Sequence, residues 1–442
     1  MGWIMIFLNM QGRIYLLLGG IILSVISASK CGVCGDLEYA EASADNPLRG
    51  LVPYVSASGK DQFPHSMEFC YFPLKDLMEG PDEFDWEPIE KTLDEVGGRG
   101  NQLIFRVYCE YPGRESALPA FLIKGGVEII RWTNSQDGQI NHTPDYENQL
   151  LRDALATFIK ALGGRYDGDP RIAFLTAGLL GSWGEWHNFP REDLWASKGV
   201  QTEVMESYAS AFTRTMVLLR YPVGANKARY AGNHERPFGY HDDSFGWATI
   251  DTGMDEDSWY FEPSLAAAGA AEKWMSFPIG GEIRPELWKQ SFTDSRHPRD
   301  QGFVTCVERL HASWLMDSGL FNAGIPLDDQ RRKTALKETA RLGYEYHISS
   351  AQWSDGVITL TVENRGVAPF YYDWPVEIEV DGNVRANNWS LRGLLPGAQR
   401  KWSIQLSSDS TLRIRVPNPM KGGKPLRFAN VDQGDEWLLI KW

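Results

Sequence analysis

The sequence predicts an α/β protein in which a (β/α)8 TIM barrel precedes a small all-β sandwich domain. Apolar strand-like runs alternate with amphipathic stretches over residues 45–340, a length typical of one closed barrel of parallel βαβ units. No glycine-rich phosphate turn follows any of these runs, which disfavours the competing doubly wound open sheet. Residues 345–442 instead alternate with period two between turns, the pattern of antiparallel strands.

The barrel elements follow in order along the chain. Residues 86–95 predict a helix because Ile89, Leu93 and Val96 recur at helical spacing, and residues 103–108 predict a buried strand. The same patterns give a helix over residues 145–162, a strand over 172–175 and a helix over 203–220.

The sandwich strands are predicted over residues 357–362, 376–380 and 412–416, which turn residues separate. The linker near residues 342–344 is short and is not rich in glycine and serine. We therefore expect a fixed interface between the two domains.

The amino-acid composition indicates which kinds of binding partner are disfavoured and which are favoured. The 442 residues include 44 Lys and Arg against 58 Asp and Glu, a net charge of −14, which disfavours nucleic-acid partners and anionic membranes. The 17 Trp, 17 Tyr and 20 Phe are a large aromatic content. Aromatic rings stack on sugars or anchor interfaces, and the alternative is a large core that uses tryptophan.

The N-terminus has the anatomy of a cleaved signal peptide over residues 1–29. Arg13 precedes an apolar run over residues 14–26, which is short for a membrane span, and small residues follow up to Ser29. The sequence thus predicts a secreted or periplasmic protein without membrane attachment after cleavage. An uncleaved N-terminal anchor is the alternative.

Five cysteines argue against a metal or redox centre. Cys31 and Cys34 form a C-x-x-C pair, but no second pair completes a zinc site. Cys70 and Cys109 lie in strand-like segments, where we expect them buried and unbridged. No cofactor is expected.

The segment AFLTAGLLGSWGEWH, residues 173–187, is the most informative for chemistry. A strand runs into glycines and then presents Glu185 beside Trp183, Trp186 and His187. Active sites of (β/α)8 barrels lie at the carboxyl ends of the strands, and desolvation by indole rings suits a general acid. The alternative is a surface glutamate hydrogen-bonded within a turn.

A second glutamate, Glu282, ends the segment MSFPIGGE, so the two glutamates fall near the fourth and seventh strands. Glycoside hydrolysis needs two carboxylates, one to protonate the leaving oxygen and one to attack or activate water. We expect a neighbouring arginine or tyrosine, with Arg106 as the candidate, to keep Glu282 ionised. The alternative for Glu282 is a helix-capping role.

Other polar and aromatic side chains at candidate strand ends suit a sugar, whose hydroxyls both donate and accept. With Trp183, Trp186 and His187, the predicted substrate-binding residues are Arg106, Glu110, Asn233, His234, His241, Asp242, Asp251, His311 and Trp314. His234, His241 and the adjacent Asp242 and Asp243 are also a metal-ligand combination, but no known ligand spacing supports it, so no metal is predicted.

Several long motifs resemble a family of exported bacterial proteins that pair a glycoside-hydrolase-like barrel with a C-terminal β-domain. The motifs are NPLRGLVPY, FDW, PDYEN, RYDGDPRI, GLLGSWGEWH, FGYHDDSFG and PIGGE. The family is similar to clan A glycosidases, which implies Glu185 as acid/base and Glu282 as nucleophile. The clan's usual Asn before the acid/base is Gly184 here, so the residue that would hold the sugar 2-hydroxyl is unassigned.

The leading hypothesis is a secreted glycoside hydrolase with a poly- or oligosaccharide substrate. A non-catalytic carbohydrate-binding protein on the same barrel is the first alternative, and a structural cell-surface protein is the second. Only the first needs both glutamates in one cavity.

Overall fold

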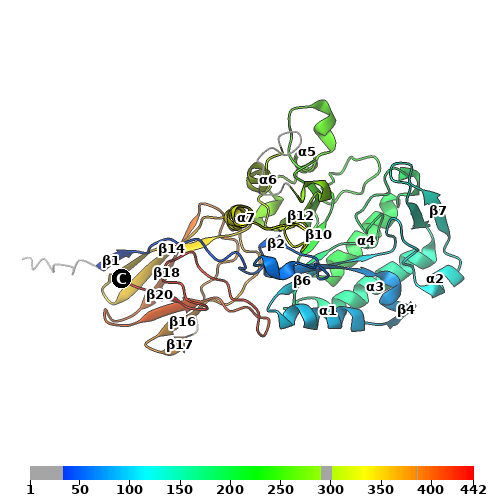
Figure 1. The fold of residues 1–442 in the computed structure, drawn as a ribbon. Coiled ribbons are helices and arrows are strands. Elements are labelled where there is room, and N and C mark those ends of the chain that lie inside the picture. The colour runs from blue at the N-terminus through cyan, green and yellow to red at the C-terminus, as the bar shows by residue number, and fades with distance from the viewer. Residues whose placement is uncertain (1–32, 290–300, 386) are drawn as a thin grey trace, which may run out of the picture.

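The computed structural model describes residues 33–289, 301–385 and 387–442. Two parts lie side by side, a barrel wrapped by helices and a pair of antiparallel sheets that contains the C-terminus (Figure 1). The predicted signal peptide and Cys31 lie outside the described residues. Within those residues, no helix has the length and apolar character that a membrane span requires.

The barrel is an eight-stranded sheet with the order β2-β13-β12-β11-β10-β9-β6-β3. Every neighbouring pair in it is parallel. A parallel bridge between Tyr54 and Phe69 joins the two outer strands, so the sheet closes as the sequence predicts. The strands are β2 (Gly50–Val52), β3 (Met67–Pro73), β6 (Gln102–Tyr108), β9 (Ile172–Thr176), β10 (Val217–Leu219), β11 (Gly239–Phe245), β12 (Ile279–Ile283) and β13 (Trp314–Met316).

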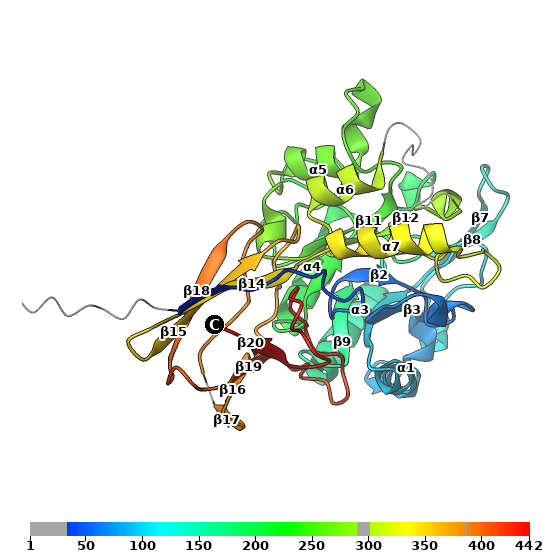
Figure 2. The ribbon, with the colours of Figure 1, turned by 60° about the vertical axis from the view of Figure 1, so that its left-hand side comes forward.

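Helices surround this barrel (Figure 2). The helix α1 (Glu87–Gly98) buries Ile89, Leu93 and Val96 as predicted, and Asn148 caps α3 by accepting a hydrogen bond from the Leu150 amide. The others are α2 (Ala120–Lys124), α3 (Gln149–Tyr166), α4 (Lys198–Ala211), α5 (Phe261–Ala268), α6 (Phe303–Leu310) and α7 (Asp329–Arg341). Short two-stranded ribbons pair β4 (Met78–Gly80) with β5 (Glu83–Phe84) and β7 (Ile129–Thr133) with β8 (Ile140–Pro144).

The helix predicted over residues 203–220 is wrong in its second half. Helix α4 ends at Ala211, and Val217–Leu219 form the barrel strand β10. A buried strand of three residues has no periodicity of its own, so its apolar side chains extended the apparent helical pattern.

The C-terminal part contains two antiparallel sheets. One orders β1 (Val33–Asp36), β14 (Tyr346–Ser354), β15 (Val357–Asn364) and β18 (Gln399–Gln405), and the other orders β17 (Asn383–Arg385), β16 (Glu377–Val380), β19 (Leu412–Arg415) and β20 (Leu438–Ile440). Alternate residues of β15 are buried, as the period-two pattern predicts. The pairing of β1 with β14 was not predicted from the sequence.

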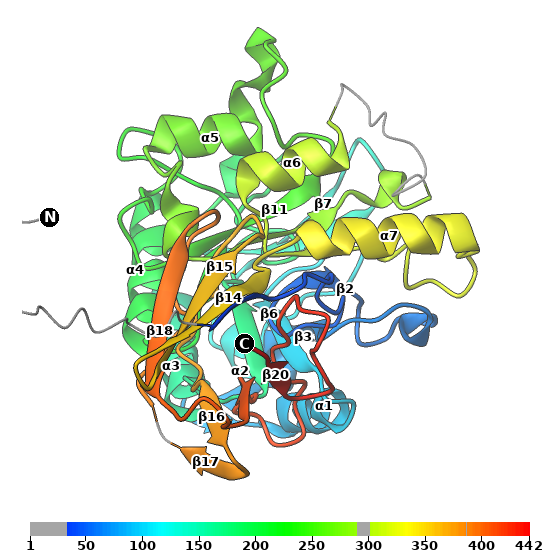
Figure 3. The same ribbon diagram turned by 90° about the vertical axis from the view of Figure 1, so that its left-hand side faces the viewer.

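One hydrophobic core runs from the barrel interior into these sheets. Phe174 and Trp314, inside the barrel, belong to the same buried cluster as Tyr344 and Tyr346 of the C-terminal part. The Tyr372 hydroxyl donates a 2.7 Å hydrogen bond to the carbonyl of Ala173, at the amino end of β9. The sheets therefore close the amino end of the barrel, as Figure 3 shows with the sheets in front, and leave its carboxyl end free for a site.

Candidate active site

Glu185 and Glu282 line one cavity of about 570 Å³. Glu282 lies in the seventh barrel strand, β12, and Glu185 lies in the loop that follows the fourth strand, β9. We call this hollow the carboxylate cavity. Its lining is Tyr54, Tyr71, Tyr111, Trp183, Glu185, His187, Arg220, Asp243, Ser244, Glu282, Arg284, Pro285, Glu286 and Trp288.

A tight coil presents Glu185. Gly178 is pressed against β6, where a Cβ would lie 1.9 Å from the Val107 carbonyl oxygen. Gly181 and Trp183 have positive φ angles of 77° and 56°, and the Glu185 amide donates to the Ser182 carbonyl at 2.8 Å. The glycines of this motif thus allow the coil to fold back over the barrel mouth.

Glu185 is buried and held by an ion pair. Arg106 Nη1 lies 2.8 Å from Glu185 Oε1, and the Tyr71 hydroxyl lies 3.5 Å from the same oxygen. Arg106 is itself only 1% exposed, so the pair is shielded from water. The expectation that Arg106 keeps Glu282 ionised is therefore wrong, because its partner is Glu185.

Among the residues that the structure describes, no guanidinium pairs with Glu282. The Tyr54 hydroxyl donates a hydrogen bond to its Oε1 at 3.3 Å. Burial, and then the negative charges of Glu185 and Asp243, raise the pKa of Glu282 to about 8. Glu282 is consequently protonated at neutral pH in the free protein.

Four charged residues of the cavity are outside the predicted set of site residues, namely Arg220, Asp243, Arg284 and Glu286. Asp243, in β11, pairs with Arg220 through a 2.5 Å contact between Oδ2 and Nε. Burial, and to a smaller extent the nearby Glu185, raises the pKa of Asp243. Arg220 directly follows β10, so the wrong helix prediction hid its place at a strand end. Asp243 was considered with its neighbour Asp242 among the polar residues near a strand end, but only Asp242 entered the predicted set. Neighbouring residues of a strand face opposite sides, and the sequence does not say which faces inward.

Most of the other predicted substrate-binding residues do not line the carboxylate cavity, which corrects that expectation. Of the predicted set, only Trp183 and His187 do so, while Arg106 lies directly beneath Glu185. The residues placed elsewhere are Glu110, Trp186, Asn233, His234, His241, Asp242, Asp251, His311 and Trp314.

Buried polar groups explain several of these placements. Glu110 accepts hydrogen bonds from Thr143, Tyr146 and Asn188, so its carboxylate ties neighbouring loops together. Asp242 accepts a bond from the Thr249 hydroxyl, and burial raises its pKa to about 7. Polar residues at the predicted strand ends therefore include some that form structural hydrogen bonds and some that line the cavity.

The remaining residues belong to the core or to outer loops. His241 packs on the fully buried Trp314, with ring centroids 5.5 Å apart. His311 stacks on Trp274 at 3.5 Å and contacts the carbonyl of Val367 in the C-terminal part. Asn233 bonds to the amide of Val223 and the carbonyl of Tyr221, His234 lies 3.8 Å from Glu235, and Asp251 accepts from the Gly253 amide.

Glu185, His187 and Asp243 form the one group in the described chain with the spacing of a metal site, since their ligand atoms lie within 4.8 Å of one another. Arg106 and Arg220 already balance the two carboxylates. His187 Nδ1 accepts a 3.3 Å bond from the Phe189 amide, which leaves the ring proton on Nε2, the atom that faces Glu185. Burial, assisted by Arg220, lowers the pKa of His187 to about 3, so the ring is neutral. These contacts do not fit a metal ligand set, and we assign none.

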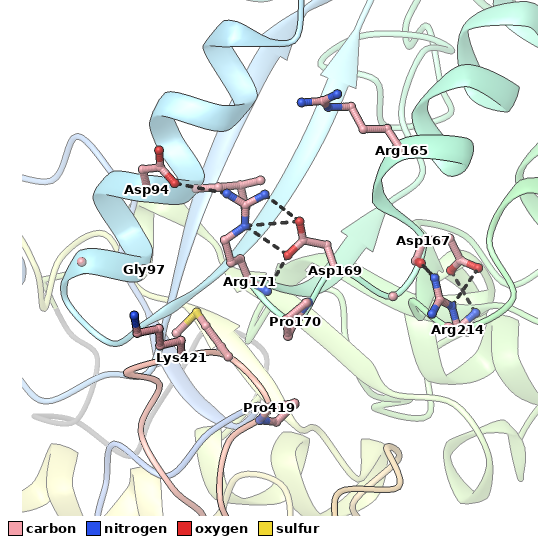
Figure 4. A pocket seen from close by; sticks show the side chains of 14 residues that line it. Asp94, Gly97, Arg165, Asp167, Asp169, Pro170, Arg171, Arg214, Pro419 and Lys421 are labelled. Carbon is pink, nitrogen blue, oxygen red and sulfur yellow. Dashed lines mark hydrogen bonds and ion pairs between the residues drawn. The ribbon is translucent and has the colours of Figure 1, made fainter.

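A larger hollow lies at the opposite end of the barrel (Figure 4). Its three arginines are engaged: Arg171 pairs with Asp169 at 2.7 Å and with Asp94 at 3.1 Å, and Arg165 pairs with Glu90. Arg214 bonds to Asp167. Lys421 also lines this hollow.

The two tryptophans beside Glu185 differ in role, which gives a prediction. Trp183 lines the carboxylate cavity, whereas Trp186 is 5% exposed and donates a 2.9 Å bond to the Ala177 carbonyl. We expect Trp183→Ala to weaken glycan binding by about 1–3 kcal/mol with little change in thermal stability. Trp186→Ala should instead lower the free energy of unfolding by about 3–5 kcal/mol. Calorimetric binding and thermal melts of both variants test this, and equal effects on binding would contradict it.

No family model and no curated protein sequence matches the chain. Among solved structures, endo-glycoceramidase II from Rhodococcus sp. is similar over 84% of this chain and 100% of that chain, with 11% identity and a TM-score of 0.42. A GH5_18 structure from Bifidobacterium longum subsp. infantis is similar over 64% of this chain and 73% of that chain, with 12% identity and a TM-score of 0.36. These likenesses concern the barrel fold, which the strand order shows independently.

Proposed function

We propose that the protein is a secreted glycoside hydrolase that cleaves a poly- or oligosaccharide with Glu185 and Glu282. The observation that carries the proposal is the charge balance of the carboxylate cavity. Arg106 pairs with Glu185 and Arg220 pairs with Asp243, while Glu282 forms no ion pair with any residue that the structure describes and has a pKa raised to about 8. A carboxyl held by an ion pair and a carboxyl with a raised pKa in one cavity suit the two different roles that glycoside hydrolysis requires.

The charge balance of the carboxylate cavity also indicates which glutamate is the acid and which is the nucleophile or base. Glu282, protonated up to about pH 8, is placed to protonate the leaving oxygen. Glu185, ion-paired with Arg106, is the carboxylate that attacks the anomeric carbon or activates water. This assignment is the reverse of the one that the resemblance to clan A glycosidases implies.

The cavity wall supports a carbohydrate ligand. Five aromatic rings line it, and charged groups lie between them. Apolar ring faces suit the C–H face of a sugar, and the charged groups suit its hydroxyls. The aromatic lining comprises Tyr54, Tyr71, Tyr111, Trp183 and Trp288.

The role of Glu282 predicts a pH dependence. Because the acid must carry its proton, kcat/KM on a glycoside with a poor leaving group should fall as pH rises through about 8. Asp243→Asn removes a charge that raises the pKa of Glu282 and frees the Arg220 guanidinium, so the basic limb should move to lower pH.

The pH profiles of wild type, Asp243→Asn and Asp251→Asn test this. Asp251 is the matched control, because it lies in an exposed turn outside the cavity. A basic limb that stays in place in Asp243→Asn would remove Asp243 from the control of Glu282. A shift of the same size in Asp251→Asn would mean that the effect is not local.

A further inference from the structure

A second hollow of about 670 Å³ adjoins the carboxylate cavity. His187 and Arg220 line both, so the two hollows share a wall. We call the second hollow the aromatic pocket. Its apolar lining is Phe189, Tyr221, Val223, Tyr230 and Trp259, contributed by the segments that follow β9, β10 and β11.

A supported stack of rings forms one wall of the aromatic pocket. Tyr221 and Tyr230 lie nearly parallel, with centroids 5.9 Å apart and an interplanar angle of 16°, and Trp195 backs Tyr230 at 5.8 Å. The Tyr221 hydroxyl donates to the Trp259 carbonyl, and Arg220 lies over the Tyr221 ring at 5.4 Å. Arg220, which balances Asp243, therefore also orients this wall.

Two large rings of the pocket remain open to solvent. Phe189 is 54% exposed and Trp259 is 50% exposed. Exposed aromatic faces gathered beside a polar cavity mark a binding surface, because a ligand that covers them gains the hydrophobic free energy.

The rim of the pocket is polar. Glu192 and Lys227 line it with exposed side chains, in addition to the shared His187 and Arg220. A purely apolar leaving group would gain nothing from these four groups. A sugar ring would use both kinds of surface, since its C–H face stacks on aromatic rings while its hydroxyls bond to charged side chains.

We propose that the aromatic pocket binds a second sugar ring of the glycan whose scissile bond lies between Glu185 and Glu282, so that the substrate is a disaccharide or longer. The proposal rests on the proposed function and adds the place where the second sugar ring is held. Each of the two pockets by itself falls in the size range of small-molecule binding sites.

The test measures binding to the full chain carrying Glu282→Gln, in which a neutral amide replaces the protonated carboxyl. The probes are mono-, di- and tetrasaccharides built on glucose, galactose, mannose and xylose, titrated by calorimetry. For the sugar that binds, we expect the disaccharide to bind about tenfold more tightly than the monosaccharide. Trp259→Ala and Tyr230→Ala should remove that advantage, and Trp259→Phe should retain most of it.

Trp437→Ala is the matched control, because Trp437 packs against Arg413 and Arg415 in the C-terminal sheets. Hydrolysis of aryl glycosides by the wild type is followed in parallel. If the mono- and disaccharide bind with equal affinity and hydrolysis is present, the sugar-binding role of the aromatic pocket is overturned. The proposed hydrolase activity is then retained. Tighter binding of alkyl glycosides than of disaccharides would also overturn it, in favour of an apolar leaving group. If the protein neither hydrolyses nor binds any probe, both proposals are overturned.

Discussion

Glu185→Gln is expected to abolish turnover of every glycoside, whatever its leaving group. In the proposed mechanism, the carboxylate that Arg106 holds at 2.8 Å attacks the sugar or takes a proton from water, and an amide does neither. We expect a loss of at least about 10³-fold in kcat/KM on natural and activated substrates alike. The measurement is a pair of kinetic series, one on the glycan and one on a dinitrophenyl glycoside.

Glu282→Gln should behave differently. The dinitrophenolate leaving group departs without a proton, so this variant should keep much of its activity on the activated substrate. On the natural glycan it should lose about 10²–10⁴-fold. Glu286→Gln is the matched control, because Glu286 lines the same cavity but is exposed and paired with Arg284 at 2.8 Å. It should change either rate by less than about tenfold.

The alternatives make opposite predictions. The opposite result is that Glu185→Gln keeps its activity on the activated substrate while Glu282→Gln loses activity on both substrates. It would support Glu185 as acid/base and Glu282 as nucleophile, the roles that the resemblance implies. Full activity in both variants would remove both residues from the mechanism. Glycan binding without any turnover in the wild type would identify a carbohydrate-binding protein.

The barrel and both glutamates were predictable because their signals are local. The strand Gln102–Tyr108 is apolar apart from Gln102 and Arg106, and glycines precede Glu185 in the loop after β9 and Glu282 in β12. Glycine at these positions meets a steric need: a Cβ on Gly280 would lie 2.1 Å from the Trp314 ring, and one on Gly281 would lie 2.4 Å from the Asp242 carbonyl oxygen.

The charge pairing was not predictable, because it joins residues far apart in the sequence. Arg106 and Glu185 are 79 positions apart. Arg220 depends on a three-residue strand without a periodic signal, and the choice between Asp242 and Asp243 depends on which face of β11 points into the barrel. The predicted set contained Asp242, which is buried away from the cavity, and left out its neighbour Asp243, which lines it.

A chain that ends at Arg341 should fail to fold. The sheets after this residue cover the amino end of the barrel, and their buried side chains share one cluster with Phe174 and Trp314. Removing them exposes those side chains, leaves β1 without its partner β14, and breaks the hydrogen bond from Tyr372 to Ala173. Burial of a single large side chain contributes about 1.5–3 kcal/mol, so the loss of several exceeds a typical domain stability of about 5–15 kcal/mol.

The expected result is an insoluble or molten shortened chain, measured by soluble yield and by the loss of a cooperative thermal transition. Co-expression of residues 342–442 as a separate chain should restore solubility, because the interface is a continuous hydrophobic core rather than a tether. Tyr372→Phe is the graded control: it removes only the hydroxyl that bonds to Ala173 and should cost about 0.5–1.5 kcal/mol. A shortened chain that melts cooperatively at the wild-type temperature would show that the barrel is stable alone, and the shared core would then be a contact surface between independent domains.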